Sequence, residues 1–314
     1  MRLRGQIVHF LGNRHGLPCD LFHAVSNIAL MAIMLDKVCM SRFGCVCLCV
    51  TILASRALGQ WLNFPEKHTP RLKSGKPNLS APVPRALDGK LDLSGVWRTE
   101  FAPPSEHSNT FDIPGDHPSE FSKYFFNVMA DYKDDKALMR PEGIEMMRKN
   151  RAIEGDSPQS RCLPMSIPAV EILSYTPMKI IQARRETMII YELDSTFRQI
   201  HTDGRWLPKD PQPSWMGYSV GRWEGDAFVV DTAGFNDKSP LDGSGHPRSE
   251  TTHLIERFHR RDFGHMDIEF TVDDPTMYTK SFSFKVKELL EPDSDVLETI
   301  CNENERDRAH LPRK

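Results

Sequence analysis

The densest group of residues that could do chemistry lies in and just after one glycine-rich stretch, Gly234–Pro247. Its polar members are Asp237, Asp242, His246, Glu250 and His253. A histidine beside a carboxylate can move protons near neutral pH, because its own pKa lies in that range. We therefore interpret His246 and Glu250 as the candidate catalytic pair.

Two other interpretations of these residues stay open. His246, Glu250 and His253 have the spacing i, i+4, i+7, which on a helix would place them on one face, where they could bind a divalent metal. Pro247 and the surrounding glycines favour a loop that enters a strand, so we predict no metal site and no cofactor. In such a loop the Asp and His side chains could also simply cap turns.

Arg198, in the predicted strand Phe197–Thr202, is the second candidate. If its side chain points into a barrel, the guanidinium could hold a ligand carboxylate through two hydrogen bonds. If it points outward, it would pair with a neighbouring acid. The residues that we expect to contact a ligand are Arg198, Tyr218, Trp223, Asn236 and Asp242.

The best-defined element near these residues is a hairpin formed by Tyr218–Trp223 and Ala227–Thr232. Its turn, Glu224-Gly225-Asp226, contains a glycine that can supply the positive φ of a tight turn. Ser219 lies in the first of these strands rather than at a strand-to-helix elbow, so the sequence does not support acyl transfer.

The sequence after Met178 predicts a succession of short strands with close turns. Besides the hairpin they are Met178–Ala183, Thr187–Glu192, Phe197–Thr202, His253–Arg260, His265–Val272, Lys280–Leu290 and Asp295–Cys301. With Leu93–Thr99 they number about ten, which favours an antiparallel barrel or sandwich. Before them, serine capping and apolar spacing predict helices over Ser119–Ala130 and Lys136–Asn150.

Two of these strands alternate cleanly between apolar and polar side chains. The residues that we expect to face inward are Met266, Ile268, Phe270, Val272, Phe282, Phe284 and Val286. The polar partners in the same strands should face outward.

The first 59 residues are typical of a leader. Met40–Gln60 has a basic start, a short apolar core and small residues at Ala57 and Gly59, as in a secretory signal peptide. Translation could begin at Met40, and a buried hydrophobic helix is the alternative. Residues 60–90 are rich in proline and predict a tether. The folded domain should then span residues 91–314.

The charge distribution bears on the choice of partner, and the cysteine count supports export. Residues 1–59 hold six of the 40 basic and two of the 43 acidic residues, so the remainder carries a net charge of −7. This argues against nucleic acid or an anionic membrane surface as a partner. Of seven cysteines only Cys162 and Cys301 follow the leader. We predict that they form a disulfide, with two separate buried thiols as the alternative.

Two resemblances are carried by particular motifs. Ser94-Gly-Val-Trp97 resembles the Gly-x-Trp start of lipocalin-like barrels, and Trp223–Val230 is similar to a late hairpin of the lipocalin and fatty-acid-binding group. Residues 91–311 also resemble a functionally uncharacterised family of secreted bacterial proteins. The motifs that carry this second likeness are Arg161–Pro164, Phe197–Ile200, Pro208–Pro211, Ser219–Asp237, Gly245–Glu250, Asp273–Pro275 and Cys301–Glu305.

These observations lead to one expectation with two alternatives. We expect a mainly β, antiparallel lipocalin-like barrel of about 8–10 strands, with a loop and helix insertion after the first strand. It would be secreted or periplasmic, have no transmembrane span after leader cleavage, and bind a small, largely apolar molecule inside the barrel. The alternatives are a cofactor-independent enzyme that uses the same cavity, and a cell-envelope interaction module without a ligand.

Overall fold

The computed structural model describes residues 65–102, 122–152 and 158–301. The predicted leader, residues 1–59, lies outside the described residues. So do Asn302–Glu305 of the last family motif.

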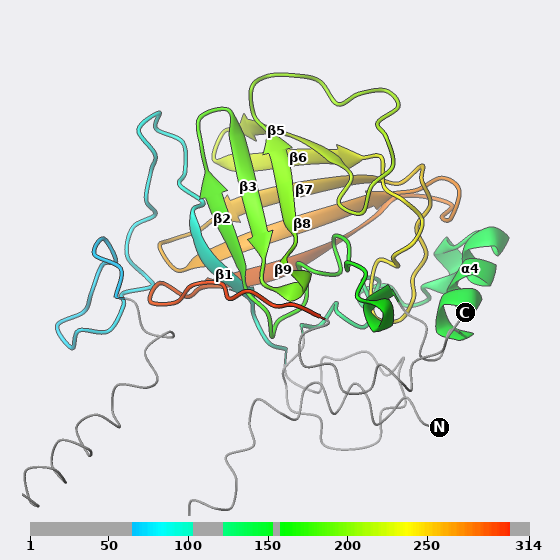
Figure 1. The fold of residues 1–314 in the computed structure, drawn as a ribbon, viewed down its shortest axis with the longest axis horizontal. Coiled ribbons are helices and arrows are strands. Elements are labelled where there is room, and N and C mark those ends of the chain that lie inside the picture. The colour runs from blue at the N-terminus through cyan, green and yellow to red at the C-terminus, as the bar shows by residue number, and fades with distance from the viewer. Residues whose placement is uncertain (1–64, 103–121, 153–157, 302–314) are drawn as a thin grey trace, which may run out of the picture. The chain divides into compact units, whose positions relative to one another are not determined.

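Nine strands close into a barrel in sequence order (Figure 1). They are β1 (Gly95–Thr99), β2 (Met178–Gln182), β3 (Glu186–Tyr191), β4 (Phe197–His201), β5 (Tyr218–Glu224), β6 (Ala227–Ala233), β7 (His253–Arg260), β8 (His265–Asp273) and β9 (Phe282–Leu290). The predicted barrel with its insertion after the first strand is confirmed, and it is compatible with a lipocalin-like fold. The predicted last strand, Asp295–Cys301, is wrong, because this segment joins no sheet.

Neighbouring strands pair antiparallel everywhere except between β4 and β5. Residues 202–217 carry the chain from one end of the barrel back to the other, so β4 and β5 run in the same direction. Only Ile200–Ser219 and His201–Val220 pair across this seam, against eight residue pairs between β7 and β8.

The inner surface of the barrel follows the alternation of the strands. All seven apolar residues predicted to face inward on β8 and β9 are buried, which confirms this part of the prediction. Phe270 pairs with Phe284 across the two strands, and their rings stack with centroids 5.0 Å apart.

The two ends of the barrel differ. At the hairpin end, tight turns join β2 to β3, β5 to β6 and β7 to β8. At the other end, which we call the long-loop end, segments 100–177, 192–196, 234–252 and 274–281 join β1 to β2, β3 to β4, β6 to β7 and β8 to β9. Three of the four longest connections therefore begin and end at the same end of the barrel, and the fourth, 202–217, runs from one end to the other.

The hairpin end is closed by an arginine and a tryptophan. The indole of Trp97 donates a hydrogen bond to the carbonyl of Leu93 (2.9 Å). The guanidinium of Arg260 lies 4.8 Å from the Trp97 ring and donates to several backbone carbonyls, including that of Asp92. Both side chains are almost fully buried and fill the interior at this end.

The proline-rich segment that was predicted to be a tether is bonded to the same end of the barrel. The amides of Phe263 and Gly264 donate to the carbonyls of Ala81 (2.9 Å) and Leu79 (2.7 Å). Arg71 pairs with Asp293. Hydrogen bonds to the barrel thus begin before Leu91, the predicted start of the folded domain.

In its described residues, the insertion after β1 contains one α-helix, α4 (Pro141–Ala152), preceded by the 3-10 helix η2 (Lys136–Leu138). The predicted helix Lys136–Asn150 therefore begins later, at Pro141, whose missing N–H needs no partner in the first turn of a helix. The helix predicted over Ser119–Ala130 is wrong within the described residues. Residues 122–130 form turns, because the amide of Val128 bonds to Asp242 (2.8 Å) instead of a helical carbonyl.

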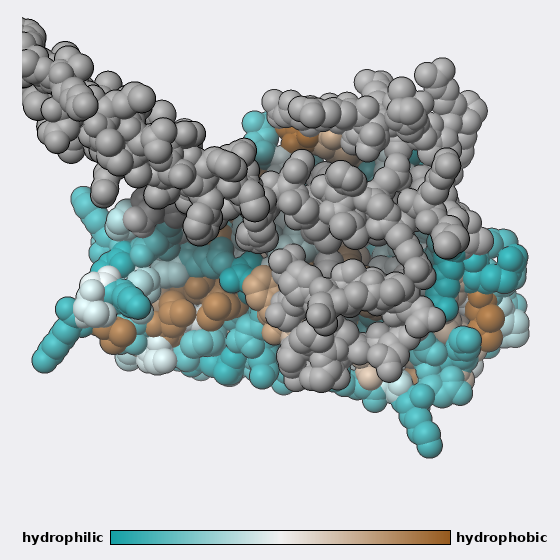
Figure 2. All heavy atoms as spheres, turned by 90° about the horizontal axis from the view of Figure 1, so that it is seen from below, coloured by the Kyte–Doolittle hydropathy of each residue, from teal (hydrophilic) through white to brown (hydrophobic). Residues whose placement is uncertain are grey.

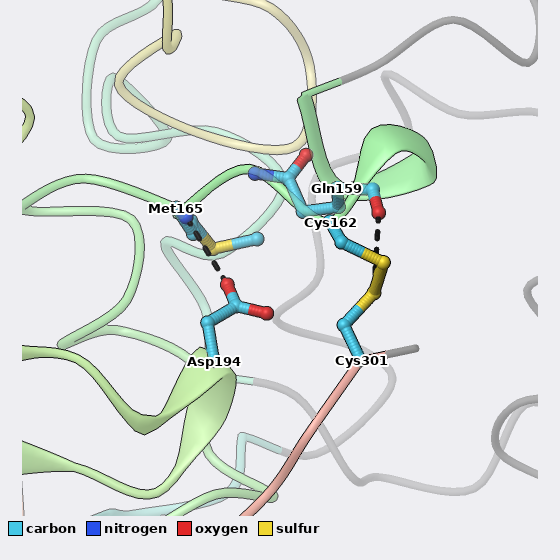
Figure 3. Close-up of a disulfide and its surroundings, with 5 residues drawn as sticks. All are labelled: Gln159, Cys162, Met165, Asp194 and Cys301. Carbon is cyan, nitrogen blue, oxygen red and sulfur yellow. Dashed lines mark hydrogen bonds between the residues drawn. A yellow bond between two sulfur atoms is a disulfide. The ribbon is translucent and has the colours of Figure 1, made fainter. Parts of the chain in front are cut away.

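A disulfide joins Cys162, just after η3 (Pro158–Arg161), to Cys301, as predicted (Figure 3). It ties the end of the described chain to the insertion. Nearby, in η4 (Leu193–Ser195), Asp194 accepts a hydrogen bond from the amide of Met165 (3.3 Å).

The described surface seen from below is mainly hydrophilic, with separate hydrophobic areas (Figure 2). Across the described residues, the large apolar side chains that are most exposed are Leu87, Trp206 and Phe197.

Candidate functional site

Five ionisable side chains are buried inside the barrel, and we call them the interior charge cluster. They are Glu171, Tyr191, Arg198, Glu256 and Glu288, and none is more than 3% exposed. Four of them come from strands β3, β4, β7 and β9, where the inward alternation of each strand aims them at the barrel axis. Glu171 comes from the turns of residues 167–172, which lead to β2.

Arg198 is at the centre of the cluster, and every N–H of its guanidinium is used. Its Nε donates to Ser219 Oγ (3.0 Å) and one Nη2 hydrogen to Thr232 Oγ1 (2.7 Å). Glu256 accepts from both terminal nitrogens in a bidentate ion pair. The remaining Nη1 hydrogen goes to Glu171 Oε1 (3.2 Å). Of the two orientations that the sequence leaves open for Arg198, the structure shows the inward one.

Glu171 has one satisfied and one free oxygen. Its Oε1 accepts from the hydroxyl of Tyr191 and from Arg198, whereas Oε2 has no hydrogen-bond partner among the described residues. Burial, together with the nearby charge of Glu256, raises the pKa of Glu171 to about 8 against the opposing effect of Arg198. At neutral pH this buried carboxyl group is therefore mostly protonated.

Glu288 repeats the pattern. Its Oε1 accepts from the hydroxyl of Thr99 (2.8 Å), and its Oε2 has no partner within the described chain. Burial raises the pKa of Glu288 well above its usual value. The Thr99 hydroxyl also lies 2.6 Å from the backbone carbonyl of Glu171, which places the two carboxyl residues on either side of one side chain.

The cluster is bordered by apolar side chains on the same inner surface. Those opposite or next to it in the strand register include Ile189, Val230, Phe270 and Phe284. All four are 3% exposed or less. Inside the barrel, buried apolar side chains therefore surround one polar region.

The predicted catalytic pair does not come together. His246 is fully buried in the loop between β6 and β7, and its Nδ1 contacts Asp242 (2.6 Å) while its Nε2 contacts Asp135 (3.3 Å). Glu250 is exposed and does not hydrogen-bond His246 in the described structure. Because Asp242 and Asp135 occupy both ring nitrogens, none is left for a substrate proton.

The charge state of His246 also differs from that of a general base. Burial alone would lower the pKa of His246, but the two aspartates outweigh it and raise the pKa to about 9. At neutral pH the ring is a cation that holds the loop to the insertion. His253, at the start of β7, pairs instead with Asp231 on β6 (3.2 Å). The described residues contain no group of three or more His, Cys, Asp or Glu that could hold a metal.

The other predicted ligand contacts are dispersed. Tyr218 lies at the rim, where its hydroxyl accepts from Arg205 (2.9 Å). Trp223 packs on Phe228 at the hairpin end, with centroids 5.2 Å apart. Asn236 is in the loop after β6, where its side chain accepts from the amide of Lys238 (3.2 Å). Asp242 is committed to His246 and to backbone amides. Of the expected contacts, only Arg198 belongs to the interior charge cluster.

Three acids of the cluster were not predicted, although two left a signal. Glu256 falls at an inward position of β7, between Leu254 and Phe258. Glu288 extends the inward series of Phe284 and Val286 by one step. A charged residue at an apolar inward position indicates either a buried pair or a binding site. Glu171 left no such signal, because its segment has no periodicity.

None of the described helices is both long enough and apolar enough to cross a membrane. Comparison of the chain with protein-family models, with curated proteins and with solved structures finds no match.

Proposed function

We propose that this protein binds a small, largely apolar molecule inside its barrel, with the interior charge cluster receiving the ligand's polar head. One observation carries the proposal: Glu171 Oε2 and Glu288 Oε2 are buried carboxyl oxygens without a hydrogen-bond partner among the described residues. Such atoms are rare in folded proteins, because each costs about 1–3 kcal/mol when left unpaired. A ligand head that hydrogen-bonds to them would remove this cost.

The surrounding wall supports the apolar part of the proposal. Buried aromatic and aliphatic side chains line the same inner surface, and a ligand body that contacts them would be removed from water. Because the Trp97–Arg260 contact closes the hairpin end, entry would be from the long-loop end or through the short β4–β5 seam.

Export is part of the same proposal. The predicted signal peptide would deliver the chain to an oxidising compartment, where the Cys162–Cys301 disulfide can form and persist. The ligand would then be one that the protein meets outside the cytoplasm.

Native mass spectrometry of the mature protein, purified from its own host, tests the proposal. We expect a retained mass of a few hundred daltons that disappears on denaturation, and a chain that begins after Ala57 or Gly59. A protein that is empty, and that also fails to take up a fluorescent apolar probe, would contradict ligand binding. A mature chain that still contains residues 1–39 would contradict export.

A second candidate function, acid–base catalysis in the same interior, is favoured by the raised pKa of Glu171. A carboxyl group that is protonated at neutral pH can act as a general acid. In that case Glu171→Gln would abolish turnover of the retained molecule but spare its uptake. Equal loss of uptake and turnover would assign Glu171 to binding alone.

A further inference from the structure

We infer that the polar head of the interior ligand is an organic cation of the alkylammonium type, held by Glu171 and Glu288. This inference rests on the proposed function and specifies its ligand class. It follows from which hydrogen-bonding groups of the interior charge cluster are occupied and which remain.

The cluster contains three carboxyl groups and a single guanidinium. Arg198 pairs with Glu256 through two hydrogen bonds and with Glu171 Oε1 through one more (3.2 Å), so a single guanidinium is shared by two acids, and Glu288 forms no ion pair within the described chain. A ligand cation would supply the missing positive charge. A ligand anion would add a further negative charge to a buried site that already has an excess of acids.

The free hydrogen-bonding groups lead to the same ligand class. All five N–H groups of Arg198 already have acceptors inside the protein, so it has none left for the ligand carboxylate that the sequence suggested. The free atoms are Glu171 Oε2 and Glu288 Oε2. Once deprotonated these oxygens only accept hydrogen bonds, and an ammonium group has three N–H donors and no acceptor.

An organic cation fits better than a metal ion. The described residues contain no cluster of three or more His, Cys, Asp or Glu that could coordinate a metal. The apolar side chains beside the cluster, among them Phe270 and Phe284, offer contact to an alkyl or aryl body, which a metal ion lacks.

Binding of an ammonium group should release a proton from the site. Glu171 is mostly protonated at neutral pH in the free protein. When an ammonium group arrives, a carboxyl proton leaves to solvent and the resulting carboxylate accepts an N–H hydrogen bond. No covalent bond forms, and no redox partner is needed.

The test is isothermal titration calorimetry at pH 7 with three probes that share one apolar body: octylamine, octanol and octanoate. A hydrogen bond to a charged group favours octylamine by about 10- to 100-fold. Removing a proton from a group with a pKa of about 8 offsets about tenfold of this at pH 7, so we expect octylamine to bind up to about tenfold more tightly than octanol. Titrations in buffers of different ionisation enthalpy should show proton release with octylamine and none with octanol.

Two variants assign the preference to the cluster. Glu288→Gln should reduce the octylamine preference over octanol to within about threefold, because glutamine keeps an oxygen that can hydrogen-bond to octanol but cannot become a carboxylate for octylamine. Glutamine is isosteric with a protonated glutamate, so this variant should fold. If Glu288→Gln does not fold, Glu171→Gln provides the same measurement. Glu298→Gln, a change at an exposed acid, is the matched control and should bind all three probes like the unaltered protein.

The outcomes separate the inference from the proposed function. If octanol binds as tightly as octylamine, or octanoate binds most tightly, the cationic head is wrong while interior binding stands. If octylamine binds without releasing a proton, or binds both glutamine variants as it binds the unaltered protein, Glu171 and Glu288 do not form the ligand site. If none of the probes binds, the proposed function fails and the inference fails with it.

Discussion

At the scale of single residues, Arg198 has the largest predicted effect. Its guanidinium is buried and pairs with Glu256 and Glu171. Arg198→Met would leave these acids without a cation, and breaking a buried pair from one side typically costs about 3–5 kcal/mol. We expect the free energy of unfolding, measured with urea, to fall by that amount.

The double variant Arg198→Met with Glu256→Gln is the control. Because glutamine carries no charge, no unpaired carboxylate remains at that position, and part of the lost stability should return. If the double variant is less stable than the single one, the loss comes from packing at Arg198 and not from its charge.

The pH dependence of stability is a second prediction at this scale. The pKa values of Glu171 (about 8) and His246 (about 9) are raised in the folded state, and that of Glu288 is raised as well. Between the unfolded and folded pKa of each group, the folded protein binds more protons than the unfolded chain. Stability must therefore fall as the pH rises.

The window follows from the same values. We expect the free energy of unfolding to decrease from pH 5 to pH 9, with the contribution of Glu171 lost by about pH 8 and that of His246 by about pH 9. The hydrogen bond with Arg205 lowers the pKa of Asp203 to about 2, so Asp203 changes the pH dependence of stability only below about pH 4. Glu171→Gln should make the slope between pH 5 and pH 8 shallower. An unchanged slope would contradict the raised pKa.

The site could be predicted only in part because pairing depends on tertiary register. Arg198 and His246 are noticeable in the sequence, and a strand pattern can place Arg198 inside a barrel. The strand pattern does not predict which acidic side chain pairs with which basic one. His246 binds Asp135, which lies 111 positions earlier in the chain, rather than Glu250 four positions later.

At the scale of elements, α4 has a glycine where alanine would normally be preferred. A Cβ at Gly143 would lie 2.4 Å from the backbone oxygen of Met277, the same oxygen that accepts from the amide of Arg140 (2.8 Å). Glycine to alanine in a helix usually gains about 1 kcal/mol. Here Gly143→Ala should instead cost about 1–3 kcal/mol in urea unfolding, because the helix must move away from the loop.

Ile144→Ala serves as the comparison in the same helix, since Ile144 is 44% exposed. It should change stability by less than about 0.5 kcal/mol, as surface substitutions usually do. A stabilising Gly143→Ala would mean that α4 does not pack against Met277 in solution.

The β4–β5 seam predicts a gradient of backbone protection. Two residue pairs join these strands, whereas eight join β7 to β8 and eight join β8 to β9. Fewer shared hydrogen bonds mean a lower free energy of local opening. In hydrogen–deuterium exchange, peptides from β4 and β5 should therefore exchange faster than those from β8. Equal protection would argue against the seam as an entry route.

Local patterns were enough to predict most elements. Alternation and turn residues predict the eight strands that follow β1, the hairpin at Gly225 and the inward residues of β8 and β9. The helix over Ser119–Ala130 failed because a distant side chain, Asp242, takes one of its amides. The attachment of Leu79 and Ala81 to the barrel depends on backbone hydrogen bonds, which composition does not indicate.

At the scale of the whole molecule, the chain concentrates its connections at the long-loop end. The loop that carries His246 is bonded there to Asp135 of the insertion, and Arg248 of the same loop donates to Ser166 (2.7 Å) near Glu171. The residues around the interior charge cluster thus come from segments that are far apart in sequence. This arrangement makes the site sensitive to the position of the insertion.

The disulfide holds that insertion and leads to the last prediction. Cys162 and Cys301 are 139 residues apart in sequence, so their bond restricts a long loop of the unfolded chain. The chain-entropy estimate for such a loop is about 4–5 kcal/mol of stabilisation. The Cys162→Ser, Cys301→Ser double variant should unfold at a lower urea concentration by up to that free energy. Reduction of the unaltered protein should reproduce the loss, while reductant should leave the double variant unchanged. Coincident unfolding curves for the oxidised protein and the double variant would show that the bond does not constrain the unfolded chain, and that noncovalent contacts hold the insertion in place.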